Sequence, residues 1–99
     1  MNKTFLIMSV EEHVTALSHL PIESLRIRPN SSEETRVNGD STVLITVWKD
    51  ELVGGELQIV VQGCQPPSGM RRVVYSRGFK IDVEGTVKSL SESELSEFS

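Results

Sequence analysis

The sequence predicts a single α+β domain with an antiparallel or mixed sheet of about five to six strands, an N-terminal amphipathic helix and a short C-terminal helix. Two dense apolar runs, residues 43–48 and 57–61, are rich in β-branched side chains and predict adjacent strands. Helical spacing of apolar residues near the N-terminus and a serine-glutamate pair near the C-terminus predict the two helices. The chain of 99 residues has the size of one domain, residues 1–99.

The two apolar runs differ in their pattern. Residues 43–48 are apolar at both alternating sets of positions, which predicts a central strand buried on both faces. Residues 56–62 alternate between polar and apolar side chains, which predicts one buried face and one wet face.

The N-terminal segment predicts a short strand over residues 4–8, followed by a helix. Ser9 has the character of a helix N-cap, and Glu12 completes a capping box with it. The helix is expected over residues 10–20, because Pro21 stops it. Its apolar stripe consists of Val10, Val14 and Leu17.

The next segment predicts a half-exposed strand and then a polar connection. Leu25 and Ile27 alternate with polar residues over 23–28, and Pro29 ends the pattern. Residues 30–40 are polar and form either a loop or a hairpin tip, with Asn38-Gly39 favouring a turn.

A prolyl pair at 66–67 predicts a turn or crossover over residues 63–69, since no central strand passes through it. Residues 70–83 predict a strand. Every second residue from 73 to 83 is apolar or aromatic, with Arg77 as the exception. Either residues 76–78 form a bulge or Arg77 points to the core side; we favour the bulge, because an unpaired buried guanidinium is costly and Gly78 allows the backbone to bend.

The C-terminal segment predicts a hairpin and a helix. Glu84-Gly85 forms the turn into a strand over residues 86–90. Ser91 and Glu94 form a second capping box, which starts a peripheral helix or tail over residues 91–99. Leu95 and Phe98 are expected to pack on the body of the domain.

Charge and cysteine content restrict the function classes. The net charge is −4, which argues against a nucleic-acid partner. Cys64 is the only cysteine, so an intramolecular disulfide is excluded and a reducing compartment is expected. The short apolar run near the N-terminus predicts no export signal, and no run is long enough to cross a membrane, so we expect a cytoplasmic protein without membrane contact.

The residues suited to catalysis do not form a convincing set. His13 lies on the flank of the predicted helix stripe and His19 on the opposite face, so the two histidines do not converge. Cys64 is more simply a small buried side chain than a nucleophile. No phosphate loop, metal-ligand spacing or nucleophile motif is found in the sequence, and we expect no catalytic residue, no metal and no cofactor.

One basic cluster is the candidate binding site. Residues 65–81 carry four basic residues and no acid, whereas residues 82–99 carry five acids and one lysine. Guanidinium groups among aromatic rings can bind carboxylates, phosphates or a protein partner, although a solvated strand face would look the same. The candidate binding residues are Arg71, Arg72, Tyr75, Arg77 and Lys80, with His13 added for a pocket beside the first helix.

These observations favour a non-enzymatic interaction or adaptor domain. Its partner is another protein or a second copy, bound through the basic strand or an exposed sheet edge; in a homodimer, the acidic C-terminal segment of one copy would pair with the basic strand of the other. The alternative is a domain that binds a small anionic ligand, or a small enzyme, with a pocket between the first helix and the sheet lined by His13, Tyr75 or Arg77.

Overall fold

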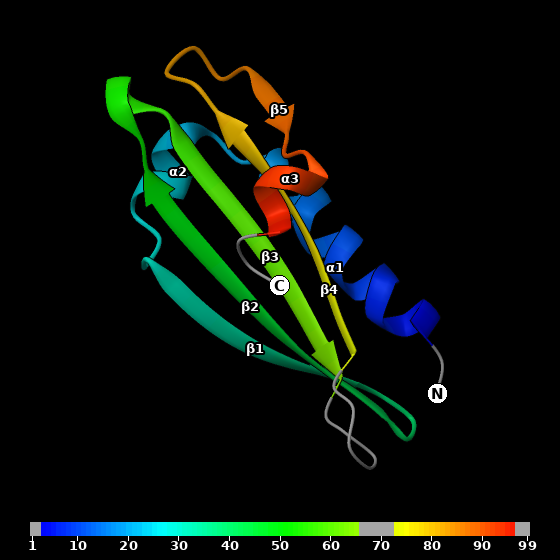
Figure 1. Cartoon of the computed structure of the whole chain (residues 1–99). Coiled ribbons are helices and arrows are strands. Elements are labelled where there is room, and N and C mark those ends of the chain that lie inside the picture. Colours follow the sequence, from blue (N-terminus) through cyan, green and yellow to red (C-terminus); the bar gives the residue numbers. More distant parts are fainter. Residues whose placement is uncertain (1–2, 66–72, 97–99) are drawn as a thin grey trace.

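The computed structural model describes residues 3–65 and 73–96. The elements are α1 (Lys3–Ser18), α2 (Ile22–Arg26), β1 (Ser31–Asn38), β2 (Ser41–Glu51), the 3₁₀ turn η1 (Val53–Gly55), β3 (Leu57–Gln65), β4 (Val73–Ile81), β5 (Val87–Ser89) and α3 (Glu92–Leu95). The strands form one antiparallel sheet in the order β1-β2-β3-β4-β5, so each strand pairs with its neighbour in sequence (Figure 1). The predicted α+β class is confirmed.

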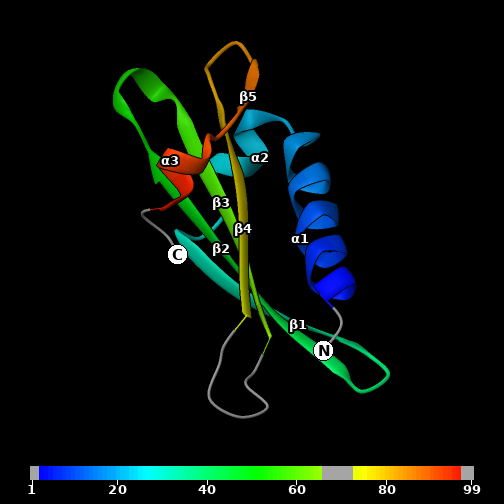
Figure 2. The same ribbon diagram turned by 45° about the vertical axis from the view of Figure 1, so that its right-hand side comes forward.

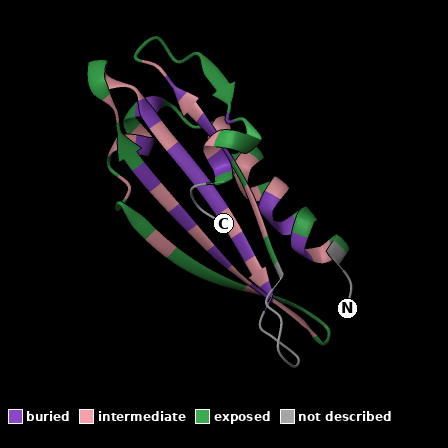
Figure 3. Cartoon of the chain, viewed as in Figure 1, coloured by how far each residue is buried: buried purple, intermediate pink, exposed green. Residues whose placement is uncertain are grey.

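The main hydrophobic core lies between α1 and one face of the sheet, which we call the inner face (Figure 2). Alternate residues of β2 and β3 point into it, which gives the banded burial seen along these strands in Figure 3. At Gly63 the helix comes so close that an added Cβ would lie 2.5 Å from Val10 Cγ2 and 2.7 Å from Leu6 Cδ1. The core includes Leu6, Val10, Leu17, Leu25, Val43, Ile45, Leu57, Ile59, Phe79 and Ile81.

The described residues cover the outer face of the sheet only in part. The short helix α3 lies on this face (Figure 2). Its Leu95 forms a small second cluster with Leu90, Val60 and Trp48. Gly78 makes room for this cluster, because a Cβ at that position would lie 2.7 Å from Leu90 Cδ1. The predicted capping box of Ser91 and Glu94 is confirmed, and it starts α3.

The prediction of a strand over residues 4–8 is wrong, since α1 already begins at Lys3. Leu6 lies four residues before Val10 and extends the apolar stripe of the helix by one turn. Ser9 is therefore not an N-cap: it lies inside α1 and is only 2% exposed.

The prediction of a strand over residues 23–28 is also wrong. Residues 22–26 form α2, which begins after Pro21 and buries Ile22 and Leu25, three positions apart. Ile27, which alternation had placed inside, is 86% exposed. The polar segment 30–40 is mostly the strand β1, and the predicted turn joins it to β2, with Gly39 at a φ of 61°.

The favoured bulge at residues 76–78 is not formed, because β4 pairs with β3 without interruption from Val73 to Ile81. The alternative is found: Arg77 projects on the inner face, opposite Val61, and its side chain reaches the flank of α1. β2 lies between β1 and β3 and is an interior strand, as predicted, but its residues 44, 46 and 48 are only partly buried, so the predicted burial on both faces is wrong. The turn at Gly85 is confirmed by its φ of 90°, whereas Pro66, Pro67 and Phe98 lie outside the described residues.

Candidate functional site

The structure divides the predicted basic cluster between the two faces of the sheet. Tyr75 and Arg77 lie on the inner face, and Lys80 lies on the outer face, because side chains alternate along β4. Arg71 and Arg72 lie outside the described residues. The part of the cluster that the structure describes is therefore not one continuous patch.

On the inner face, Glu11 of α1 contacts both Tyr75 and Arg77 of β4. Its Oε1 accepts a 2.6 Å hydrogen bond from the Tyr75 hydroxyl and lies 3.3 Å from Arg77 Nε. Partial burial, and then the hydrogen bond to the Glu11 carboxylate, raise the pKa of Tyr75 above its usual 10.0, while Arg77 acts in the opposite direction. These contacts tie β4 to the helix.

On the outer face, Lys80 holds the acidic helix α3. Its Nζ lies 2.7 Å from Glu94 Oε2. This hydrogen bond, supported by those from the backbone and side chain of Ser91, lowers the pKa of Glu94 to about 2. The basic strand and the acidic C-terminal segment therefore do pair, and in this structure they do so within one chain.

His13 lies on the other flank of α1, facing the edge strand β1. Its Nε2 lies 2.9 Å from Glu34 Oε2, and Arg36 of the same strand lies 2.9 Å from Glu12. A depression of about 320 Å³ beside these pairs is also lined by Arg28. The structure therefore does not bring His13 together with Tyr75 and Arg77, because α1 and its packed core separate them.

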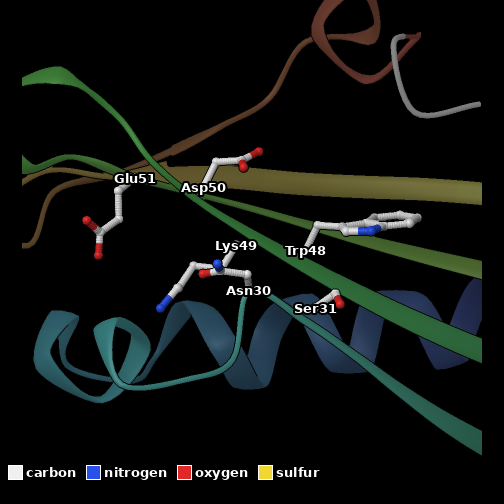
Figure 4. A pocket seen from close by; sticks show the side chains of 6 residues that line it. All are labelled: Asn30, Ser31, Trp48, Lys49, Asp50 and Glu51. Carbon is white, nitrogen blue, oxygen red and sulfur yellow. The ribbon is translucent and has the colours of Figure 1, made fainter.

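A second depression, of about 560 Å³, straddles the sheet edge where β1 begins (Figure 4). Lys49 lines it, but this ammonium already donates 2.6 Å hydrogen bonds to the carbonyl oxygens of Arg26 and Arg28. Trp48 and Asp50 belong to the opposite face of the sheet. The lining side chains do not converge on one point.

A third depression, of about 240 Å³, was not anticipated from the sequence. It lies between α3 and β4, beyond the point where the short strand β5 stops. Its lining residues are Val74, Tyr75, Ser76, Glu92, Leu95 and Ser96. The signal that could have indicated it is the brevity of the last predicted strand: among the described residues, β5 pairs only with the C-terminal part of β4.

At this place the described residues leave one side of the β4 backbone without a paired strand. Leu90 N donates a 2.9 Å hydrogen bond to Gly78 O, so the polar backbone groups of Gly78 point away from β3. Backbone groups alternate along a strand, and those of Val74 and Ser76 therefore face the same side. On the N-terminal side of Gly78, no strand of the described residues pairs with this edge of β4.

Within residues 3–65 and 73–96, no group of three or more His, Cys, Asp or Glu side chains could hold a metal ion. None of the helices in that same part of the chain is long and apolar enough to cross a membrane. No protein-family model, curated protein sequence or solved structure matches the chain significantly. Function is therefore inferred from the geometry of the chain itself.

Proposed function

We propose that this protein is a non-enzymatic protein-interaction domain whose partner adds an extended segment to the open edge of β4. The observation that carries the proposal is the outward-facing backbone of Val74 and Ser76, next to the depression under α3. Edge backbone groups of this kind are used in strand addition, where main-chain hydrogen bonds give affinity and side-chain pockets give specificity.

The lining of the depression indicates the partner's chemistry. Val74 is 38% exposed and lies with Leu95 in the lining, so an apolar side chain of the partner would find apolar surface there. Glu92 lines the same depression and has no ion pair among the described residues. We therefore expect a partner segment with an apolar side chain close to a lysine or arginine. The single cysteine, Cys64, supports a reducing setting for this interaction, such as the cytoplasm.

Selection from a library of random extended peptides, followed by affinity measurements on two variants, tests the proposal. Ser76→Pro removes the outward amide and leaves the pairing with β3 in place, because that amide does not point at β3. Ser76→Ala is the matched control: it keeps the amide and loses the same hydroxyl, which accepts a hydrogen bond from Gln62.

We expect selected peptides to combine apolar and basic residues and to bind Ser76→Pro about tenfold more weakly than the wild type, since a lost backbone hydrogen bond is worth roughly 1 kcal/mol and the proline ring adds a steric clash. Binding to Ser76→Ala should be close to that of the wild type. Peptides that bind all three proteins equally, or a library that yields no binder, would contradict the proposal.

A second candidate function is the binding of a small anionic ligand in the depression between α1 and β1. Arg28, Arg36 and His13 line it, which favours an anion, although Glu34 and Glu12 already neutralise part of this charge. Titration with inorganic phosphate, followed by amide chemical shifts, tests this candidate. Shifts confined to α1 and β1 that disappear in Arg28→Gln would support it, and unchanged spectra would rule phosphate out.

A further inference from the structure

The opposite edge of the sheet is formed by β1, and no other strand of residues 3–65 and 73–96 pairs with it. Lys49 N donates a 2.8 Å hydrogen bond to Asn30 O, which identifies residues 30 and 49 as a hydrogen-bonded pair. The register of β1 and β2 then makes every second pair from there hydrogen-bonded. The backbone groups that point away from β2, toward the free edge, are those of Ser31, Glu33, Thr35 and Val37.

This edge lacks most of the structural features that prevent edge strands from pairing with other molecules. β1 runs for eight residues, Ser31–Asn38, in unbroken register with β2, without a bulge, and contains no proline, glycine or lysine. No other strand of the described residues covers it. Only its charges, Glu33, Glu34 and Arg36, could prevent pairing, so the register in which they meet decides whether a second strand can bind.

We propose that β1 pairs antiparallel with β1 of a second copy, around a two-fold axis at Thr35. Centring the axis on Glu33 or on Glu34 would place that carboxylate opposite its own copy, which is destabilising. Centring it on Thr35 places Glu34 opposite Arg36 of the second copy, twice by symmetry. Of the registers that overlap most of the strand, this one alone brings opposite charges together.

The side chains of Glu34 and Arg36 are at least partly exposed, and contacts with α1 fix their orientation. Glu34 is 57% and Arg36 34% exposed, and both lie on the inner face, where His13 and Glu12 of α1 hold them. In the proposed register Thr35 faces Thr35 and Glu33 faces Val37, each as a hydrogen-bonded pair, because all of these backbones point to the free edge. The sheets of the two copies then become one continuous sheet.

Thr35→Pro is the decisive variant, because the Thr35 amide has no role in the pairing with β2 but would donate across the two-fold axis. Thr35→Ala is its control, since it keeps the amide. Sedimentation equilibrium over a wide concentration range should show a dimer for the wild type and for Thr35→Ala, and a monomer for Thr35→Pro. Circular dichroism of Thr35→Pro should show the secondary structure of the wild type.

A cross-linking experiment tests the register and does not depend on the proline variant. In a Cys64→Ser background, Thr35→Cys places two thiols on the axis with Cα atoms about 5.5 Å apart, a separation that a disulfide can span. Glu33→Cys places the thiols far from each other. Mild oxidation should therefore link Thr35→Cys rapidly and Glu33→Cys slowly.

A wild type that stays monomeric at all concentrations, a Thr35→Pro variant that dimerises as tightly as the wild type, or faster linking through Glu33→Cys would each overturn the proposal. Peptide binding at β4 uses the other edge of the sheet and should be unchanged in Thr35→Pro. The failure of one proposal therefore does not imply the failure of the other.

Discussion

Replacing Gly63 by alanine should destabilise the domain, although the same change elsewhere in a strand often stabilises. Alanine restricts the unfolded chain and would by itself contribute about 0.4–1 kcal/mol of stability. Here, however, the new Cβ would lie 2.5 Å from Val10 Cγ2 and 2.7 Å from Leu6 Cδ1, so α1 must shift. Overpacking of a core costs about 1–3 kcal/mol, and we expect a net loss of about 1–2 kcal/mol.

A double-mutant cycle shows whether the predicted clash is the cause. Val10→Ala removes the methyl group nearest to the new Cβ, so Gly63→Ala should cost less in that background, with a coupling of at least about 0.5 kcal/mol. Urea unfolding, followed by circular dichroism and by the fluorescence of Trp48, measures all four free energies. The reasoning is refuted if Gly63→Ala is neutral or stabilising, or if the two changes are additive.

Three further predictions concern polar contacts. Lys49→Met leaves the carbonyl oxygens at the end of α2 without their donor and should lower the free energy of unfolding in urea by about 1.5–3 kcal/mol; an unchanged midpoint would contradict this. Because the pKa of Glu94 falls from 4.5 to about 2 on folding, its contribution to the stability of the folded state is complete above pH 4.5 and is lost as the pH falls toward 2. Trp48 packs in the same cluster as α3, so its fluorescence emission should change over that pH window in the wild type and change less in Glu94→Gln. Tyr75, the only tyrosine, should ionise with a pKa above 10.0 in an ultraviolet titration. Glu11→Gln should lower that pKa but not as far as 10.0, because burial is the larger cause of the shift. If Glu11→Gln left the pKa unchanged, the hydrogen bond from Tyr75 to Glu11 would be contradicted.

The sheet centre and the C-terminal cap could be predicted because each has a local signal. The runs that became β2 and β3 are β-branched and flanked by turn residues, and both are strands. The capping box of Ser91 and Glu94 needs only residues three apart, and it forms as predicted. Local chemistry and tertiary packing favour the same structure at these positions.

The errors occur where a local pattern competes with packing elsewhere. Ser9 and Glu12 have the spacing of a capping box, but the buried stripe begins one turn earlier at Leu6, so the serine lies inside the helix. In α2, alternation of Leu25 and Ile27 predicted a strand, whereas the burial of Ile22 with Leu25 against the core selects a helix.

The candidate site could be predicted only in part. The charges of Arg77 and Lys80 are visible in the sequence, but their division between two faces follows from the unbroken pairing of β4 with β3. Their partners Glu11 and Glu94 come from distant helices, and no sequence spacing relates them. The two open edges depend on where β5 stops and on the strand order, which are properties of the whole sheet.

The polar strand β1 shows why an open edge can coexist with a stable core. None of its side chains is buried, so apolar burial contributes little to its position. It is held by the ladder with β2 and by the contacts of Glu34 and Arg36 with α1. An edge strand fixed mainly by backbone hydrogen bonds is among the less stable parts of a domain. Pairing with a second copy would give the outward amides of β1 hydrogen-bond partners and turn it into an interior strand. Association would therefore stabilise a strand that apolar burial stabilises little.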